Sequence, residues 1–184
     1  MDFFNTPIAG LLVLAPRVFN DNRGYFFESY NKNTLAEIGI HTDFVQDNES
    51  YSCQNTLRGL HFQKPPFAQA KLVRVIEGRV WDVAVDLRKD SPTFGQWFGV
   101  ELSAENKKQF FIPRGFAHGF SVLSQTAKFA YKCDNFYNKA SEGAILFNDP
   151  DLHIDWKIDT ALSNLSAKDK LNQPFAKYKE NPCF

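Results

Sequence analysis

The sequence lacks the features that mark several classes of protein. Its 21 basic and 21 acidic residues cancel, so we expect neither nucleic acid nor an anionic membrane as a partner. Its three cysteines, Cys53, Cys133 and Cys183, are far apart and in no metal-like spacing. The apolar run "IAGLLVLAP" has no basic leader and is far shorter than the ~20 residues of a membrane-spanning helix. Free thiols and the lack of a targeting segment predict a protein of the reducing cytoplasm.

The composition that remains is typical of a globular β protein. Hydrophobic residues make up 43% and charged residues 23% of the 184 positions, and 19 Phe and 6 Tyr favour aromatic packing between strands. A chain of this length can bury a substantial core without disulfides or metals. Because no repeat, low-complexity segment or linker divides it, we predict one domain spanning residues 1–184.

Apolar and polar residues alternate with a period of two along most of the chain, which is typical of half-buried strands. Residues 71–77 and 79–87 flank the turn signal Glu77-Gly78 and predict a β-hairpin. Helices are few: one is expected over residues 34–39, where Thr34 and Glu37 have capping-box spacing, and others beyond residue 160. The pattern predicts a mainly β protein of the jelly-roll type. Further strands are expected at residues 8–16, 25–30, 43–52, 97–103, 109–113, 119–124 and 128–137.

Cationic and titratable side chains occur within the most core-like of these strands. Arg58, His61, Lys71 and Arg74 lie between residues 56 and 87. Each of them can also be read as a solvated residue on a strand face or edge. Strict alternation places Arg58 and His61 on opposite faces of one strand, so a shared site requires a β-bulge, which Gly59 permits.

A metal site is the first alternative for a small β-barrel with two such histidines. The segment "PRGFAHGF", which contains His118, resembles the second cupin motif. The first cupin motif is broken, because Gln63 follows His61 where a second histidine is needed and Lys71 stands close to the missing carboxylate. A lysine opposes cation binding, and two imidazoles alone make a poor site. We therefore expect no metal.

Several long motifs together carry a more specific resemblance. From about "NRGYFFE" to "LSAKDK", the chain resembles the dTDP-4-dehydrorhamnose 3,5-epimerase family. The resemblance implies a cupin-type double-stranded β-helix, or jelly roll, that forms a homodimer and uses no metal or organic cofactor. The segments that carry it are "FVQDNESYS", "LRGLHFQ", "KLVRVIEGRVWDVAVDLRKDSPTFG", "FIPRGFAHGF", "FAYKCDNFYN", "SEGAILFNDPDLHIDW" and "LSAKDK".

The resemblance also implies a reaction and roles for individual residues. Family members convert dTDP-4-dehydro-6-deoxy-D-glucose to dTDP-4-dehydro-L-rhamnose by inverting carbons 3 and 5, which both adjoin the keto group. His61 is then the proton acceptor, Lys71 stabilises the enolate oxygen, and Tyr131 donates a proton from the opposite face. Asp169 is expected to pair with His61, and Asp82 is the second choice. The spacing of Asp169 from the serine three residues earlier also suits a helix cap.

A larger set of polar residues matches the positions that bind the nucleotide sugar in the family. For each of them singly, a solvated surface residue is the competing interpretation, and Tyr137 matches an aromatic that stacks on thymine. Two other functions remain open: epimerisation of carbon 3 or carbon 5 alone on a related nucleotide sugar, and a non-catalytic sugar-nucleotide binding protein. The expected binding residues are Arg23, Glu28, Gln46, Asn48, Arg58, His118, Tyr137, Glu142 and Lys168.

Overall fold

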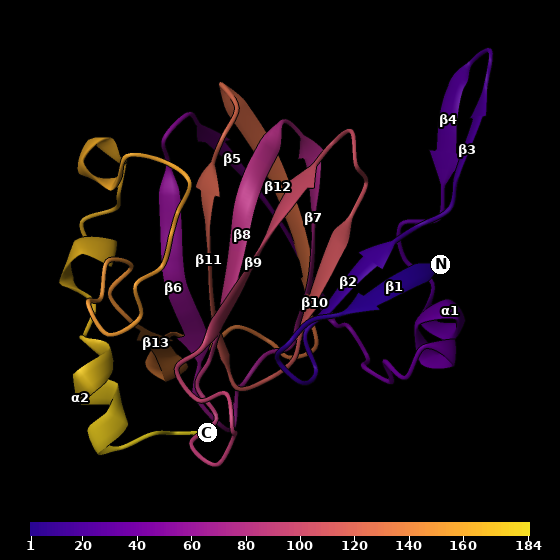
Figure 1. The fold of residues 1–184 in the computed structure, drawn as a ribbon. Coiled ribbons are helices and arrows are strands. Elements are labelled where there is room, and N and C mark those ends of the chain that lie inside the picture. The colour runs from indigo at the N-terminus through magenta and orange to yellow at the C-terminus, as the bar shows by residue number, and fades with distance from the viewer.

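The computed structural model describes all 184 residues and consists mainly of antiparallel strands in two facing sheets (Figure 1). The expected mainly β jelly roll with a few short helices is confirmed. The six-stranded sheet contains, in spatial order, β1 (Asp2–Asn5), β2 (Leu12–Ala15), β10 (Gln109–Ile112), β7 (Lys71–Glu77), β12 (Thr126–Cys133) and β5 (Gln46–Cys53).

The five-stranded sheet faces the first and carries the C-terminal segments on its outer side (Figure 1). It contains, in order, β13 (Glu142–Ala144), β6 (Leu57–Gln63), β11 (Phe116–Val122), β8 (Arg79–Asp86) and β9 (Trp97–Ser103). The remaining elements are the hairpin β3 (Val18–Asp21) and β4 (Gly24–Phe27), the helices α1 (Lys32–Glu37) and α2 (Phe175–Glu180), and the 3-10 turns η1 (Lys139–Ser141), η2 (Thr160–Leu162) and η3 (Asp169–Leu171).

Alternation along the strands builds one core on each side of the five-stranded sheet. Between the sheets, Phe120 of β11 stacks on Phe129 of β12 with ring centroids 4.3 Å apart. On the outer side, the alternate residues of β6, β8 and β11 pack against Trp156, Phe175 and Tyr178 of the C-terminal segments. The first core fills only one end of the space between the sheets, which leaves room for a cavity at the other.

The prediction of a β-hairpin over residues 71–87 is wrong, because its two strands do not pair with each other. β7 pairs with β10 and β12, whereas β8 pairs with β11 and β9 in the other sheet. Gly78 makes the crossing with φ +78°, and a Cβ there would lie 2.0 Å from the carbonyl oxygen of Thr126. A turn signal shows that the chain reverses, but both strands are apolar on the core side and alternation does not specify which sheet each one joins.

Helix α1 begins earlier than its expected capping box. Asn31 is the N-cap, and its side chain accepts hydrogen bonds from the backbone N–H groups of Asn33 and Thr34. Thr34 is therefore inside the helix. Asparagine caps a helix about as well as serine and better than threonine, so Asn31 is the N-cap instead of Thr34, three residues later. The end is as expected, since Gly39 follows the helix with φ +86°.

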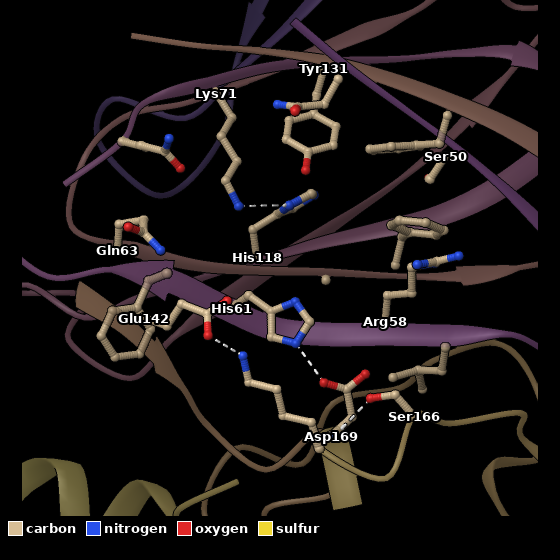
Figure 2. Close-up of a pocket in the computed structure, with 18 of the residues that line it drawn as sticks. Ser50, Arg58, His61, Gln63, Lys71, His118, Tyr131, Glu142, Ser166 and Asp169 are labelled. Atoms are coloured by element: carbon tan, nitrogen blue, oxygen red, sulfur yellow. Dashed lines mark hydrogen bonds and ion pairs between the residues drawn. The ribbon is translucent and has the colours of Figure 1, made fainter. Parts of the chain in front are cut away.

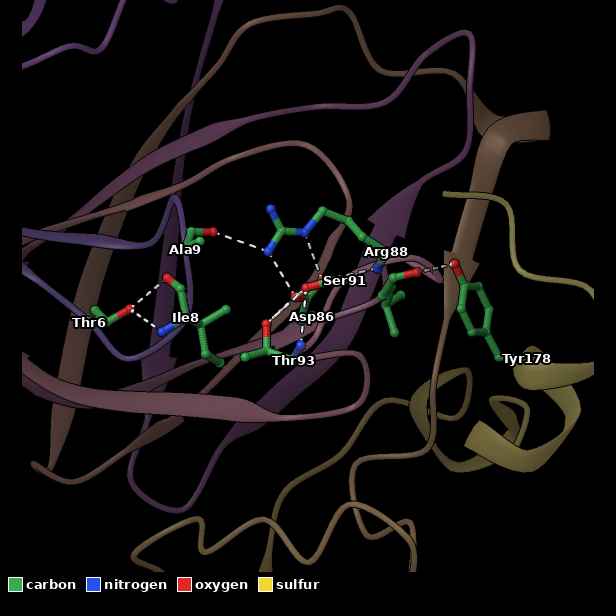
Figure 3. Close-up of polar contacts among 9 residues, drawn as sticks. Thr6, Ile8, Ala9, Asp86, Arg88, Ser91, Thr93 and Tyr178 are labelled. Carbon is green, nitrogen blue, oxygen red and sulfur yellow. Dashed lines mark hydrogen bonds and ion pairs between the residues drawn. The ribbon is translucent and has the colours of Figure 1, made fainter.

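A buried carboxylate ties the end of β8 to the N-terminal loop (Figure 3). Asp86 accepts hydrogen bonds from Arg88 at 2.8 Å, Ser91 at 2.6 Å and Thr93 at 2.7 Å. The guanidinium of Arg88 also donates to the carbonyl of Ala9 at 3.1 Å. This network joins the end of β8 to the N-terminal loop, and none of its side chains lines the cavity described below. No helix in the structure has both the length and the apolar surface needed to cross a membrane.

Candidate active site

A polar cavity of about 650 Å³ lies between the two sheets. This volume falls in the range of small-molecule binding sites. Only 7 of its 24 lining residues are hydrophobic, which is unusual for the interior of a β-barrel and points to a polar ligand. The lining side chains come from β5, β6, β7, β11, β12 and β13, from residues 164–169 of the C-terminal segment, and from Thr56, Gln69 and Tyr137 outside the strands.

A β-bulge in β6 brings Arg58 and His61 to the same cavity. His118 of β11 is the register partner of His61 and Phe120 is the partner of Arg58, so three residue steps on β6 match two on β11. Gly59 absorbs the irregularity with φ +139°, and a Cβ there would lie 2.6 Å from the Cα of Gly119. The bulge therefore requires glycine at position 59, whereas the sequence indicated only that this glycine permits one.

His61 contacts a buried carboxylate from the C-terminal segment (Figure 2). Its Nε2 lies 2.5 Å from Oδ1 of Asp169, whose side chain is 4% exposed against 42% for the histidine. Burial alone raises the pKa of Asp169, but the hydrogen bond and charge of His61, with Ser166 and Asn172, leave it below its usual value. The backbone N–H of Asp169 also donates to Ser166 Oγ at 3.1 Å, so the expected cap and the histidine contact coexist.

Lys71 and Tyr131 enter the cavity from the opposite sheet (Figure 2). They lie on the neighbouring strands β7 and β12, and the ammonium of Lys71 is 5.9 Å from the centroid of the Tyr131 ring. Burial lowers the pKa of Lys71, while the charges of Cys133 and Asp82 partly restore it. Burial also raises the pKa of Tyr131, which keeps the phenol protonated near neutral pH. A cation and a proton donor thus face the His61 side of the cavity.

Asp82 contacts His118 and not His61. The Nε2 atom of His118 lies 3.0 and 3.1 Å from the two carboxylate oxygens of Asp82, which is completely buried. Its Nδ1 lies 3.5 Å from Nζ of Lys71. The second choice for the partner of His61 is therefore wrong in position, because the side chain of Asp82 projects from β8 toward β11, one strand away from β6.

The other expected binding residues of the cavity form linked polar contacts. Gln46 donates to Oδ1 of Asn48 at 3.1 Å and accepts from the backbone N–H of Tyr137 at 2.9 Å. Lys168 forms an ion pair with Glu142, and this hydrogen bond lowers the pKa of the glutamate. The ring of Tyr137 is exposed at the cavity mouth.

Two of the expected binding residues lie outside the cavity. Arg23 is at the tip of the β3–β4 hairpin, which projects away from the barrel (Figure 1), and it pairs with Asp21 at 2.6 Å. Glu28 follows the hairpin and approaches the hydroxyl of Thr34 at 3.4 Å. Neither lines the cavity of its own chain. Their expected role in substrate binding therefore stays a prediction, because a single chain does not bring them to its own cavity.

Sequence reasoning missed several residues that line the cavity. Gln63 and Gln69 stand where a metal-binding cupin would have ligands, and that substitution was the signal that could have identified them. Gln63 accepts a hydrogen bond from the backbone N–H of Asn138 at 3.0 Å and so supports the loop that carries Tyr137. Ser50 of β5 lines the cavity too, but serine on a strand gives no sequence signal.

The residues present do not fit a metal site. The structure contains no group of three or more His, Cys, Asp or Glu side chains placed to hold a metal ion. Where two histidines meet, at the register pair His61 and His118, each is already engaged: the first by Asp169 and the second by Asp82 and Lys71. An ammonium 3.5 Å from Nδ1 of His118 opposes a metal cation there.

Comparison with known proteins agrees with this geometry. Residues 5–177 match the family model for dTDP-4-dehydrorhamnose 3,5-epimerase. The chain is 58% identical over 170 residues to the enzyme of that name from Salmonella typhimurium, with 92% of each chain covered. The crystal structure of the one from Elizabethkingia anophelis has a TM-score of 0.92 and 58% identity, covering 96% of this chain and 97% of that one. The Legionella pneumophila enzyme in complex with dTDP-4-keto-L-rhamnose has a TM-score of 0.91 and 49% identity, covering 95% and 93%. The chain therefore belongs to the dTDP-4-dehydrorhamnose 3,5-epimerase family of isomerases.

Proposed function

We propose that this 3,5-epimerase inverts each carbon with a base and an acid on opposite faces of the sugar, His61 and Tyr131. The observation that carries the proposal is that these two side chains come from opposite sheets and point into one cavity (Figure 2). Carbons 3 and 5 of dTDP-4-dehydro-6-deoxy-D-glucose both adjoin the keto group, so loss of either proton gives an enolate. The planar enolate accepts a proton on either face, and the face chosen sets the product.

Asp169 and Lys71 support the proton transfer in different ways. The Asp169 carboxylate holds one nitrogen of His61, so the other nitrogen receives the proton and the carboxylate stabilises the imidazolium that forms. The ammonium of Lys71 stabilises the developing enolate oxygen. A fixed donor of this kind contributes on the order of 10² to 10³ in rate.

Proton balance requires a resetting step between the two carbons. Each inversion leaves an extra proton on His61 and removes one from Tyr131. Both residues must regain their starting protonation before the second carbon reacts. The side chain of His61 is 42% exposed, so it can exchange its proton with water.

The remaining polar residues of the cavity bind the dTDP group in this proposal. Arg58 forms no ion pair within the chain, and it donates to Ser52 at 3.1 Å and to the carbonyl of Tyr51 at 3.3 Å. It is free to bind the diphosphate, whereas Lys168 is neutralised by Glu142. Tyr137 stacks on thymine at the mouth. The other binding residues within the cavity are Gln46, Asn48 and His118.

We further propose that the enzyme is a homodimer in which the β3–β4 hairpin of one copy reaches the cavity of the other. The hairpin leaves Phe19, Tyr25 and Phe26 between 51% and 69% exposed, an apolar surface that a monomer rarely presents. The diphosphate carries about two negative charges and needs more than one cation. Arg23 at the hairpin tip supplies the second, with Glu28 close behind it.

The substrate in deuterated water tests the function. Proton NMR should show deuterium entering both carbons 3 and 5 as the L-configured product forms. Deuterium at one carbon alone indicates a single-carbon epimerase, and binding without exchange indicates a non-catalytic protein.

We propose that no cofactor takes part, so exhaustive chelation should leave turnover unchanged. Turnover that is lost on chelation and restored by added zinc would contradict this. The three free cysteines agree with a cytoplasmic location.

A further inference from the structure

A buried carboxylate lies behind the cavity wall without lining it. Asp82, in the middle of β8, is 0% exposed and contacts His118 of β11 through both oxygens. The same imidazole contacts Lys71 of β7. The three side chains Asp82, His118 and Lys71 therefore form one hydrogen-bonded relay, which comes from three strands of both sheets and ends at the cavity. Figure 2 shows the end formed by Lys71 and His118.

The hydrogen bonds of this relay determine the tautomer of His118. When Lys71 is charged its ammonium has donors only, so Nδ1 of His118, which faces it at 3.5 Å, then accepts. The proton of the neutral ring is then on Nε2, where it is shared between the Asp82 oxygens at 3.0 and 3.1 Å. The ring of Phe129 stacks on the imidazole at 25°, with centroids 6.0 Å apart, and limits its rotation. Burial together with Lys71 lowers the pKa of His118, against the pull of Asp82, which agrees with a neutral ring.

The same relay of side chains supplies the counter-charge of Lys71. The titratable groups facing this ammonium are Cys133, its register partner on β12, the Tyr131 phenol, and His118 with Asp82 behind it. Burial raises the pKa of Cys133 to about 11 and also raises that of Tyr131, so both are neutral near pH 7. Burial raises the pKa of Asp82 as well, but His118 and Lys71 oppose this rise. The pKa of Asp82 stays above its usual value, but a carboxyl is the strongest acid of these groups and both of its oxygens contact His118, so Asp82 is the group placed to supply the counter-charge of Lys71.

We propose that Asp82 is a positioning residue for catalysis: it holds His118 in the Nε2–H tautomer, so that Nδ1 accepts from Lys71 and keeps its ammonium charged and directed at the substrate carbonyl. The consequence for turnover rests on the proposed role of Lys71 in the reaction. The tautomer and the protonation of Lys71 do not, because both are properties of the free enzyme.

The first experiment measures the free enzyme by NMR. Two-bond ¹H–¹⁵N spectra of the wild type should show His118 as the Nε2–H tautomer, and a wild-type Nδ1–H tautomer overturns the proposal without any variant. In Asp82→Asn, the neutral amide can donate as well as accept, so the Nδ1–H tautomer should become populated. Loss of the counter-charge should lower the pKa of Lys71, followed by its ¹³Cε shift, by on the order of one unit.

The second experiment separates positioning from stability. Asp86→Asn is the matched control, because Asp86 is equally buried on the same strand but bonds to Arg88, Ser91 and Thr93. The alkaline limb of the turnover profile should move to lower pH in Asp82→Asn by the same amount as the Lys71 pKa, and should not move in Asp86→Asn. An unmoved limb, with wild-type tautomer and Lys71 pKa, overturns the proposal.

A double variant tests whether Asp82 acts through Lys71. Lys71→Met should lower turnover by itself, and adding Asp82→Asn should then cost less than twofold more. A full additional loss in the double variant contradicts the proposal. Undiminished turnover in Lys71→Met alone refutes the role of Lys71 in the proposed function, and in that case the NMR measurements still decide whether Asp82 controls the tautomer.

Discussion

At the scale of single residues, base and acid are separable because they act in successive steps. His61→Asn removes the base, so no enolate forms and solvent deuterium should enter neither ring carbon. Tyr131→Phe removes only the phenolic hydroxyl, so His61 and Lys71 still make the enolate and deuterium returns from the histidine side with configuration retained. Epimerisation should fall by about 10² to 10⁴ while exchange continues. Proton NMR of the keto sugar in deuterated buffer measures both, and unchanged exchange in His61→Asn reassigns the base.

The nucleotide end of the site predicts a different kinetic result. Tyr137→Ala should raise the Michaelis constant more than it lowers the turnover number, because stacking on thymine contributes equally to ground and transition states. Phe136→Ala is the matched control, since Phe136 is the adjacent exposed aromatic but does not line the cavity. Steady-state kinetics on both variants check this. Equal Michaelis constants for Tyr137→Ala and the wild type exclude Tyr137 from the nucleotide site.

The sequence predicts the residues of the site better than their contacts. The shared cavity of Arg58 and His61 depends on a bulge at Gly59; the strand pattern showed that a shared site would need such a bulge and that Gly59 permits one, but not that the bulge forms. The pairing of Asp82 was not readable, because it depends on which strand lies beside β8. The same limit applies to Arg23, whose hairpin leaves its own barrel, and no periodicity within a strand reports where that strand is placed in space.

At the scale of elements, the Asp86 network should stabilise the junction between the end of β8 and the N-terminal loop. Asp86→Asn leaves Arg88 without its buried carboxylate and should lower the free energy of unfolding by about 2 to 3 kcal/mol at pH 7. Burial alone raises the pKa of Asp86, but the donors Arg88, Ser91 and Thr93 outweigh it and leave the pKa below its usual value. Denaturant titration measures the loss, and Asp90→Asn, an exposed neighbour, should change stability by less than about 0.5 kcal/mol.

The pH dependence of this difference has a defined sign. A carboxyl whose pKa is lower in the folded protein stabilises it fully above the unfolded pKa, near 4, and progressively less below it. The gap between wild type and Asp86→Asn should therefore be constant from about pH 6 to 8 and shrink as the pH falls below about 4. A gap that widens on acidification contradicts the assignment of Asp86 as an ionised acceptor.

Strand positions could be predicted, but strand partners and caps could not. The expected segments at 97–103 and 109–113 coincide closely with β9 and β10, because their apolar residues alternate between punctuating loops. The connection at Gly78 looked like a hairpin turn and is a crossing between sheets. A tight turn and a crossing use the same residue types, and only the packing of the whole barrel distinguishes them.

At the scale of the whole molecule, we propose that residues 1–184 act as one domain. The C-terminal segment supplies Asp169 to the cavity and covers the outer face of the five-stranded sheet through Trp156 and Phe175. The N-terminal loop is bound through Arg88 to the end of β8. Both ends of the chain therefore contribute to one barrel, and the C-terminal segment also contributes to the site, whereas the β3–β4 hairpin projects away from the barrel (Figure 1).

That exception leads to a test of the dimer by complementation. Arg23→Ala and His61→Asn should each be impaired as homodimers. In a heterodimer of the two, the cavity with intact His61 receives the hairpin with intact Arg23 if the hairpin acts on the partner, so one of the two sites is restored. Co-expression in equal amounts makes half of the dimers mixed, and activity should reach about a quarter of wild type. If Arg23 acts on its own cavity, no site is restored and activity equals the average of the two parents.

The control pairs Arg23→Ala with the Arg23→Ala/His61→Asn double variant, which has no intact hairpin and should show no rescue. Sedimentation must first show dimers at micromolar concentration, and a stable monomer there removes the homodimer from the proposal.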